Sequence, residues 1–502
     1  MRKTTFLLFS IVITVFSFFY HSSLFSPTLG SDAGVVVFMT YDFHLPRDLY
    51  FWGQNRFGSL VPLIGQVFFK VFHFSPIVSE SAAHYLLLIA GFLGFASLFR
   101  SNFTKLIFAV IWFLPPYRML DLLTNTVGEQ YSVIGIGVFL MNKFFSIKNE
   151  KYNYRHYTLL ALITFVFIIS IWVSDLAIGT VLIILCVHAA LFIKKNRAHD
   201  LQLLKKAELY YMLVGVVACI AFISYAKIHS IPAFEAYSQF NLKTFIDSFV
   251  IFKGTLVDLF LFRASEPFSS LYCWLTLFFL VYLIIDRKNI KYSSVDLKWI
   301  LIFAFDAIIG LVIILSSKWA FNNGVPCRYF VSTYIALSIV LLLILESIKE
   351  RKYRNHIKVL LLSSALIAGF GAIYNLKYIW PKTLKPKIKT VAEFEKLGNI
   401  GIIAEYTNAY VNCSDPEMIK ATPDDRYEHT INKRSYVRNI ELADEVFKQK
   451  NLYVIKDCWL NDFPDTLKQF NRVLLKDGDL FRLGDCDVCK YKLLRNTIKA
   501  NP

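Results

Sequence analysis

The chain has 502 residues, of which 56% are hydrophobic and only 18% are charged, and its mean hydropathy is +0.48. A soluble protein of this length does not need so much apolar material, so the composition indicates a polytopic membrane protein. The formal net charge of +17 does not indicate nucleic-acid binding, because the basic residues stand in short runs between apolar segments. Such runs are typical of the loops of a membrane protein, and we expect no nucleic-acid partner.

Apolar windows of about 17–25 residues predict roughly eleven transmembrane helices. In chain order the windows lie near residues 5–25, 76–99, 105–117, 128–146, 157–173, 175–193, 209–227, 269–285, 299–316, 329–348 and 357–376. The third window is short, and Pro115-Pro116 ends it. The apolar segment 60–74 is also short, and it is predicted to lie along the membrane interface.

The Lys and Arg residues of the loops predict the orientation of these helices. With the N-terminus inside, the cytoplasmic segments carry 22 Lys and Arg, whereas the segments on the opposite side carry 9. Because cytoplasmic loops collect positive charge, we expect a multi-pass protein of the cell (inner) membrane with an extracytoplasmic C-terminal segment. The first window also resembles a signal peptide, but no small-residue cleavage site precedes Asp32, which favours an uncleaved helix.

Hydropathy falls after Trp380-Pro381, which predicts a transmembrane domain at residues 1–380 and a soluble extracytoplasmic domain at 381–502. A small α/β fold is predicted for the second domain. Its expected elements are strands at 399–406 and 452–455, an amphipathic helix at 439–449 and a hairpin that turns at Asp477-Gly478.

Four cysteines lie in this second domain: Cys413, Cys458, Cys486 and Cys489. Disulfides suit an oxidising compartment. Free thiols and a zinc half-site at Cys486-x-x-Cys489 are the alternatives, and the sequence leaves all three open.

The most informative stretch follows the first apolar window and begins with Ser31-Asp32-Ala33. An acidic residue at the exit of a membrane helix is costly unless it has a function or a partner. Asp32 is therefore predicted to be a general base that deprotonates an acceptor hydroxyl at the membrane boundary. The alternative is a helix cap, in which Ser31 or Asp32 caps a helix that begins at Ala33.

Basic residues near the outer helix ends are predicted to hold a phosphate group. Arg56, together with Gln54, has the hydrogen-bonding groups for a bidentate phosphate contact, and an interfacial anchor is the alternative. Lys318 and Arg328 belong to a late external loop and are predicted to meet the same phosphate, with snorkelling at a helix end as the alternative.

Further polar and aromatic residues at the outer helix ends are predicted to line an acceptor cavity: Trp52, Glu129, Asp175 and Tyr329. Asp121 belongs to the same group of span-end residues. By contrast, the charged tip from Asp42 to Asp48 is expected to be simply solvated. Asp306 lies inside an apolar window and is expected to pair with a neighbouring helix.

Ser31-Asp32-Ala33-Gly34, followed by Trp52-Gly53-Gln54-Asn55-Arg56-Phe57-Gly58-Ser59-Leu60, resembles the first external loop of GT-C superfamily glycosyltransferases. These polytopic enzymes are related to protein O-mannosyltransferases and to the aminoarabinose transferase of lipid A. The resemblance implies inverting transfer of a sugar from a polyprenyl-phosphate donor to an envelope glycan, lipid or protein on the outer face. It also implies that Asp32 is the catalytic aspartate, and that Gln54 and Arg56 line the donor-phosphate site.

The sequence departs from the family pattern at Ala33, where the family carries a second acidic residue. A divalent metal cofactor is therefore in doubt, and no metal ligand is predicted. Three other functions compete: an O-antigen ligase or polymerase, a transporter or flippase of lipid-linked sugars, and a non-catalytic scaffold. A transporter needs polar or broken helices at mid-membrane depth, whereas most charges here lie at the ends of the apolar windows.

Overall fold

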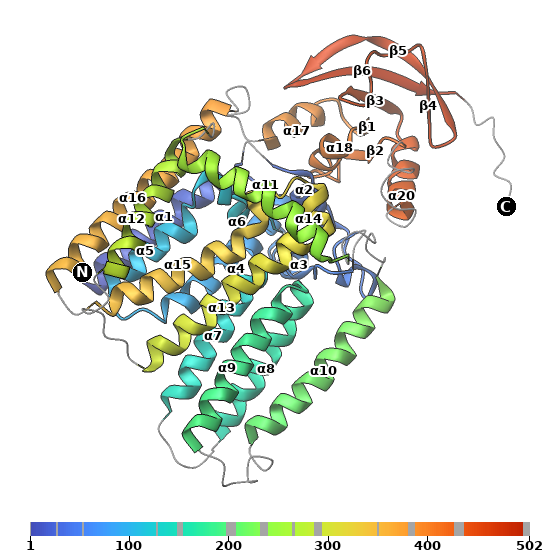
Figure 1. Ribbon diagram of the computed structural model, residues 1–502. Coiled ribbons are helices and arrows are strands. Elements are labelled where there is room, and N and C mark those ends of the chain that lie inside the picture. The colour runs from blue at the N-terminus through green and yellow to red at the C-terminus, as the bar shows by residue number, and fades with distance from the viewer. Residues whose placement is uncertain are drawn as a thin grey trace.

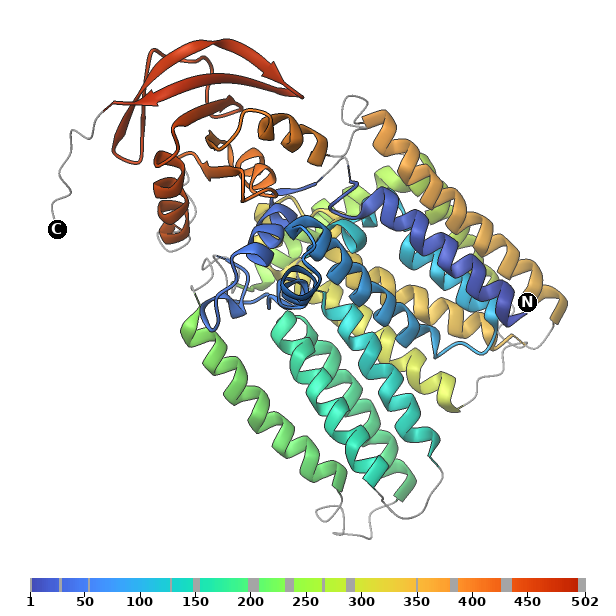
Figure 2. The ribbon, with the colours of Figure 1, turned by 180° about the vertical axis from the view of Figure 1, so that it is seen from behind.

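The computed structural model describes residues 2–26, 29–52, 55–126, 129–147, 154–196, 207–230, 239–263, 267–285, 294–348, 351–379, 387–425 and 436–494. These residues form a large helical region and, at one end of it, a smaller region with a β-sheet (Figure 1). Figure 2 shows the same arrangement from behind, with α1 and α16 side by side along one flank of the helical region.

The helical region runs from the N-terminus to Ile379. Its elements are α1 (Lys3–His21), α2 (Ser31–Tyr41), η1 (Arg47–Leu49), α3 (Leu60–Phe72), α4 (Pro76–Ala96), α5 (Asn102–Phe113), η2 (Tyr117–Met119), α6 (Asp121–Thr124), α7 (Gln130–Ser146), α8 (Tyr154–Val173), α9 (Ala177–Asn196), α10 (Ala207–His229), α11 (Leu242–Phe260), α12 (Pro267–Ile285), α13 (Ser294–Ser316), α14 (Lys318–Asn322), η6 (Cys327–Phe330), α15 (Val331–Glu346) and α16 (Arg351–Ile379).

A helix stands at each of the eleven predicted apolar windows. Within the described residues, seven helices are long and apolar enough to cross a membrane, and the bent pair formed by α5 with Tyr117–Thr124 makes an eighth. The helices α9 and α12 are apolar but shorter in their described parts, and α7 has 17 residues. The polytopic helical fold is confirmed. Within the described residues, fewer helices than the eleven expected are both long and apolar enough to span a membrane.

One helix lies outside the predicted apolar windows, in a connection expected on the extracytoplasmic side. The helix α11 occupies the connection 227–268, and its 19 residues include Lys243, Asp247, Lys253 and Asp258. These charges keep the segment below the hydropathy of a span, while Ile246, Phe249 and Val250 remain exposed on its surface. The segment is therefore an amphipathic helix and not a loop.

Polar side chains within the helical region are paired across helices. The buried Asp306 of α13 accepts hydrogen bonds from Thr180 of α9 (2.6 Å) and from the hydroxyl of Tyr131 in α7. Asp306 thus has partners on neighbouring helices, as its position in an apolar window predicted. In α1, Ser17 meets the Tyr85 hydroxyl of α4 at 3.0 Å, which ties the first helix to the bundle.

The C-terminal region contains α17 (Lys387–Glu395), β1 (Ile400–Ala404), α18 (Tyr406–Asn412), β2 (Ile419–Pro423), α20 (Tyr436–Phe447), β3 (Asn451–Lys456), β4 (Thr466–Gln469), β5 (Arg472–Leu483) and β6 (Cys486–Leu493). The six strands form one sheet in the order β2-β1-β3-β6-β5-β4. β1 pairs in parallel with β2 and β3, and the other pairs are antiparallel. The predicted strands and helix of the α/β domain are present.

The predicted hairpin turn at Asp477-Gly478 is wrong. Both residues lie inside the long strand β5, whose pairing with β6 shifts register between Lys476 and Leu480. The turn before β5 is made instead by Phe470 and Asn471, both at positive φ, and the turn after β5 contains Gly484 at φ +56°. The two residues fall within this register shift, and the residues of β5 on either side of it pair with β6. The strand therefore continues through an Asp-Gly pair that would otherwise favour a turn.

The four cysteines of this region are free thiols in the structure. Cys486 and Cys489 stand three residues apart on one strand, so their side chains point to opposite faces of the sheet. Cys486 packs in the core beneath one face and Cys489 in the core beneath the other. This geometry separates the two sulfur atoms that a disulfide or a zinc half-site would bring together.

The two regions share one hydrophobic core. Val35, Phe38 and Met39 of α2 pack in the same buried cluster as Ile400 of β1 and Tyr410 of α18. A Cβ added at Gly34 would lie 2.4 Å from the backbone oxygen of Tyr410, so α2 and α18 touch backbone to backbone. The helix that carries Asp32 is therefore the element on which the C-terminal region docks.

Candidate active site

Asp32 stands in the first turn of α2. The N-cap residue of that helix is Gly30, and no side chain caps it by a hydrogen bond. The expectation that Ser31 or Asp32 caps a helix beginning at Ala33 is therefore wrong. The Asp32 side chain is exposed, and within the described residues its carboxylate forms no hydrogen bond or ion pair. A negative charge is favourable at this end of a helix, and here it remains available to a ligand.

Two other charged residues from distant parts of the chain approach Asp32. Asp121 begins α6, which follows η2 and the break at Pro115-Pro116, and Arg328 lies in η6 directly before α15. The charge of Arg328 acts on both aspartates, and the two aspartates lie within electrostatic range of each other. Two carboxylates and one guanidinium thus converge at one end of the helical region; we call them the Asp32 cluster.

Neighbouring residues orient the cation of the Asp32 cluster. The guanidinium of Arg328 lies 5.4 Å from the centre of the Tyr329 ring, which fixes it by a cation–π contact. A second guanidinium, that of Arg118 in η2, donates to the Cys327 sulfur at 3.8 Å. Arg118 therefore lies beside the same short helix as Arg328 and adds positive charge to this end of the molecule.

The surroundings of Asp32 suit a base. Crowding by protein atoms raises the pKa of the Asp32 carboxyl above its ordinary value, and the positive charge of Arg328 opposes part of that rise. The side chain nevertheless meets solvent on one side. A carboxylate with a raised pKa is a better proton acceptor near neutral pH than an ordinary aspartate.

The segment between α2 and α3 folds back on itself. Tyr50 and Gly58 form an antiparallel bridge, and Phe51 donates its backbone N–H to Phe57 at 2.8 Å. Gly58 in turn donates to the backbone oxygen of Val173 at 3.1 Å. A Cβ at Gly58 would lie 2.7 Å from Trp172, so only glycine fits this contact.

Of the predicted residues in this segment, Trp52 lies against α2 and Arg56 lies beside Phe57. Trp52 packs edge-on against Phe38 with ring centres 5.2 Å apart, which places it beyond the middle of the helix as counted from Asp32. The half-buried guanidinium of Arg56 lies 4.9 Å from the centre of the Phe57 ring. Gln54 lies outside the described residues. The charge of Arg328, from a distant part of the chain, acts on Asp32.

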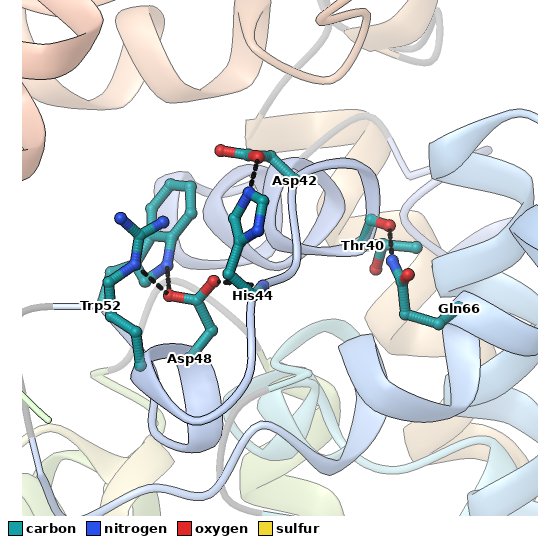
Figure 3. A network of polar contacts seen from close by, with 7 residues as sticks. Thr40, Asp42, His44, Asp48, Trp52 and Gln66 are labelled. Carbon is teal, nitrogen blue, oxygen red and sulfur yellow. Dashed lines mark hydrogen bonds and ion pairs between the residues drawn. The ribbon is translucent and has the colours of Figure 1, made fainter. Parts of the chain in front are cut away.

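The segment from Asp42 to Asp48, which was expected to be simply solvated, forms a network of hydrogen bonds (Figure 3). Asp48 is 1% exposed; its Oδ2 accepts the His44 backbone N–H at 2.7 Å, and its Oδ1 accepts the Trp52 indole N–H at 3.0 Å. Arg47 adds a third donor at 3.3 Å. Nearby, the ring of His44 meets Asp42 at 2.6 Å. Figure 3 also shows Gln66 of α3 pointing at the backbone of Thr40 in α2, to which it donates.

The remaining predicted residues have partners of their own. Glu129 is buried, with His84 of α4 at 2.8 Å and Ser132 donating to it at 3.0 Å. Asp175 pairs with Lys227 of α10 at 3.3 Å. Lys318 lies on α14 with its ammonium 4.9 Å from the centre of the Phe321 ring. Tyr329 of this group joins the Asp32 cluster, through Arg328.

Sequence reasoning named Asp121 only as one of several span-end residues, and it missed His84. Asp121 carries one local signal, its position just after a double proline that breaks an apolar segment. His84 carries none, since a histidine within a membrane helix is recognisable as a carboxylate partner only once α4 and α7 are packed together.

The Asp32 cluster does not provide the donor set of a resident divalent metal. It offers two carboxylates beside an arginine, and the described residues contain no group of three or more His, Cys, Asp or Glu able to hold an ion. The side chain that follows Asp32, Ala33, is buried in the core shared with the C-terminal region. We therefore derive no catalytic step through a metal.

No protein-family model matches the chain, and no curated protein matches it significantly. The structure is similar to crystal structures of ArnT from Cupriavidus metallidurans, one bound to undecaprenyl phosphate (10% identity, TM-score 0.54) and one in the apo state (9%, 0.51). Each likeness covers 97% of both chains. An oligosaccharyltransferase from Archaeoglobus fulgidus is more distant, at 11% identity and a TM-score of 0.43 over 91% of this chain and 70% of its own. The likeness to the two ArnT structures confirms the fold that the resemblance implied.

Proposed function

We propose that this protein is a membrane glycosyltransferase that moves a sugar from a polyprenyl-phosphate donor to an envelope glycan, lipid or protein. The observation that carries the proposal is the Asp32 cluster. An unpaired carboxylate with a raised pKa stands beside the guanidinium of Arg328, in a fold like that of ArnT bound to undecaprenyl phosphate.

The chemistry of glycosyl transfer matches these groups. Asp32 accepts the proton of the acceptor hydroxyl. At the same time the oxygen of that hydroxyl forms a bond to the anomeric carbon of the sugar. The bond from that carbon to the phosphate oxygen breaks on the opposite face, so the configuration inverts. The leaving group is the polyprenyl phosphate, whose growing negative charge Arg328 stabilises. The charge of Asp121 also acts on Arg328, so the guanidinium interacts electrostatically with both carboxylates.

Other residues extend the donor-phosphate site in this proposal. Arg56 and Gln54 belong to it through the family resemblance, and Lys318 through its place in the same late segment as Arg328. Trp52 and Tyr329 present aromatic rings of the kind that pack against sugars. Glu129 and Asp175 are already paired, so we assign them no contact with the acceptor.

The proposal includes an orientation in the membrane. The distribution of Lys and Arg places the N-terminus in the cytoplasm and the Asp32 cluster outside it, in a cell (inner) membrane. The C-terminal region, from residue 381, would then be extracytoplasmic and lie over the reaction site. Docking of that region on α2 supports a role close to the acceptor.

A glycan comparison tests the proposal in cells. A strain that lacks the gene is complemented with wild type, with Asp32→Asn or with Asp42→Asn, after equal membrane levels are verified. Asp42 is the matched control, because it stands at the other end of the same helix. We expect Asp32→Asn alone to lose one sugar from an envelope glycan and to accumulate the lipid-linked donor. Restoration of the wild-type profile by Asp32→Asn would disprove the role of Asp32.

The same experiment separates the competing functions. A transporter or flippase would leave the lipid-linked sugar on the cytoplasmic side when inactive, which labelling of intact cells detects. A ligase or polymerase would change the length or attachment of a whole glycan chain and not its sugar composition. A scaffold would tolerate Asp32→Asn in every readout.

A further inference from the structure

A second polar site lies at the opposite end of the helical region. The helices α5 and α15 are in contact and connect the two ends. Asp121 follows α5 and Arg328 precedes α15, whereas Arg100 precedes α5 and Glu346 ends α15. The twelve residues of α5 and the sixteen of α15 separate these ends by roughly 18–24 Å at 1.5 Å per residue. A site at the second end is therefore independent of the Asp32 cluster.

A cavity of about 680 Å³ opens at this second end. Its lining includes three basic side chains, those of Arg100, Arg354 and Lys358, and one acidic side chain, that of Glu346. Phe103 and Val359 contribute apolar surface. We call it the Lys358 cavity. Its charge suits an anionic ligand.

The single carboxylate of the Lys358 cavity is already occupied. Its two oxygens accept the backbone N–H groups of Arg100 and Ser101, each at 2.8 Å. Glu346 thus fixes the turn that leads into α5. The Arg100 side chain is paired as well, with Asp296 at the start of α13. Within the described residues, neither the Glu346 nor the Asp296 carboxylate makes a direct contact with the other two cations of the cavity.

The remaining cations are Arg354 and Lys358, which stand four residues apart on α16 and so share one face of the helix. Among the described residues, Arg354 donates to the backbone oxygen of Ile348, at 3.2 Å, and to no carboxylate. Lys358 is 4% exposed, and within the described residues its ammonium forms no hydrogen bond or ion pair. The charge of Glu346 acts on Lys358 without direct contact. A buried charge without a direct partner is costly, and an anion in the cavity lowers that cost.

We propose that the Lys358 cavity binds the phosphate of an anionic phospholipid from the leaflet at this end of the helices. The span on α16 begins at Arg354, so the two cations stand where a membrane helix meets the headgroups. Val359, at the rim, is 56% exposed and available to an acyl chain. Phosphate accepts charge-assisted hydrogen bonds from both cations, and the apolar rim distinguishes a lipid from a soluble phosphate.

The test uses the full-length protein, purified in detergent and delipidated, as wild type, Lys358→Met, Lys358→Arg and Lys143→Met. Lys143 is the matched control, because it is an exposed lysine at the last turn of α7, at the same end. Thermal unfolding is followed with phosphatidylglycerol, with phosphatidylcholine and with inorganic phosphate alone. Native mass spectrometry counts the retained phosphatidylglycerol.

Phosphatidylglycerol is expected to raise the Tm of wild type, Lys358→Arg and Lys143→Met, and to raise that of Lys358→Met clearly less at the same lipid concentration. Lys358→Met should bind the lipid about tenfold more weakly, as for loss of one charge-assisted hydrogen bond. It should still fold, because methionine fills similar space without the buried charge. An equal response of Lys358→Met to phosphatidylglycerol overturns the proposal. So does an equal effect of phosphatidylcholine or of inorganic phosphate on wild type.

Discussion

Asp32 in the first turn of α2 and Asp48 in η1, beyond the end of that helix, differ in exposure and in hydrogen bonding. Asp48, which follows the helix, is buried, and both of its oxygens accept hydrogen bonds from within the chain. Asp32, in the first turn, is exposed and has no such bond within the described residues. Asp48 is therefore a structural carboxylate, which holds the segment between α2 and α3. Asp32 keeps its lone pairs available, as a base requires.

Loss of the Asp32 carboxylate should give the largest effect on activity. Asp32→Asn keeps the shape of the side chain and removes its basicity, so sugar transfer should fall by about 10²–10⁴-fold. The Tm should stay near that of wild type, because the carboxylate has no internal partner to lose. Initial rates and thermal unfolding of the same preparation check both statements. A large fall in Tm would place Asp32 in the same class as Asp48.

Loss of the Asp48 carboxylate should give the opposite result. Asp48→Ala leaves the His44 N–H and the Trp52 indole N–H without their acceptor, at a cost of about 2–3 kcal/mol of unfolding free energy. Activity per folded molecule should fall far less than in Asp32→Asn. Asp42→Ala is the control, since its pair with the exposed His44 is worth less than about 1 kcal/mol. Equal Tm values for the two variants would contradict the structural role of Asp48.

Adding one methyl group at Gly34 should weaken the contact between α2 and α18. Gly34→Ala places a Cβ 2.4 Å from the Tyr410 backbone oxygen, and such overpacking costs about 1–3 kcal/mol. We expect faster amide hydrogen exchange in α18. The control is Gly254→Ala in α11, where an added Cβ meets no atom within 4 Å. Unchanged exchange in α18 of Gly34→Ala would show that the two backbones are not in contact.

The smallest expected effect is on the pH dependence of stability, through a pair of carboxyl groups in the C-terminal region. A hydrogen bond with Asp415 and partial burial raise the pKa of Glu395 to about 7, from an ordinary value of 4.5. The folded state then holds a proton that the unfolded state has lost between these values, so stability falls as pH rises from 4.5 to 7. Glu395→Gln should remove this slope. The Tm of both proteins from pH 4 to 8 checks it, and parallel curves would contradict the shared proton.

The sequence predicted the helical architecture well, because apolar composition is a local property that each window carries by itself. It failed for α11, whose Lys243 and Asp247 lie in the first turns of a helix with an exposed apolar face. It failed again at Asp477-Gly478, where the residues of β5 on either side pair with β6 and the strand continues through the two residues. Both errors occur where contacts with distant segments decide the local structure.

The candidate site was predictable in part for the same reason. Asp32 could be named because its position after a membrane helix is costly without a function. The approach of Asp121 and Arg328 to Asp32 depends on the packing of α2, α6 and η6, which are far apart in the chain. The burial of Asp48 depends on the fold of the segment around it. No local pattern distinguishes it from the solvated carboxylate that was expected.

Asp32 is proposed to be the base in sugar transfer from a lipid-linked donor. The most direct measurement mixes purified wild type, Asp32→Asn or Asp42→Asn with a lipid extract and membranes from the deletion strain. Mass spectrometry then follows the polyprenyl-phosphate-linked sugars. Wild type and Asp42→Asn should consume one such lipid and release its polyprenyl phosphate, while Asp32→Asn leaves it intact. If Asp32→Asn consumed the lipid at the wild-type rate, the role of Asp32 would be disproved. If none of the three proteins consumed it, sugar transfer from a lipid-linked donor would be disproved.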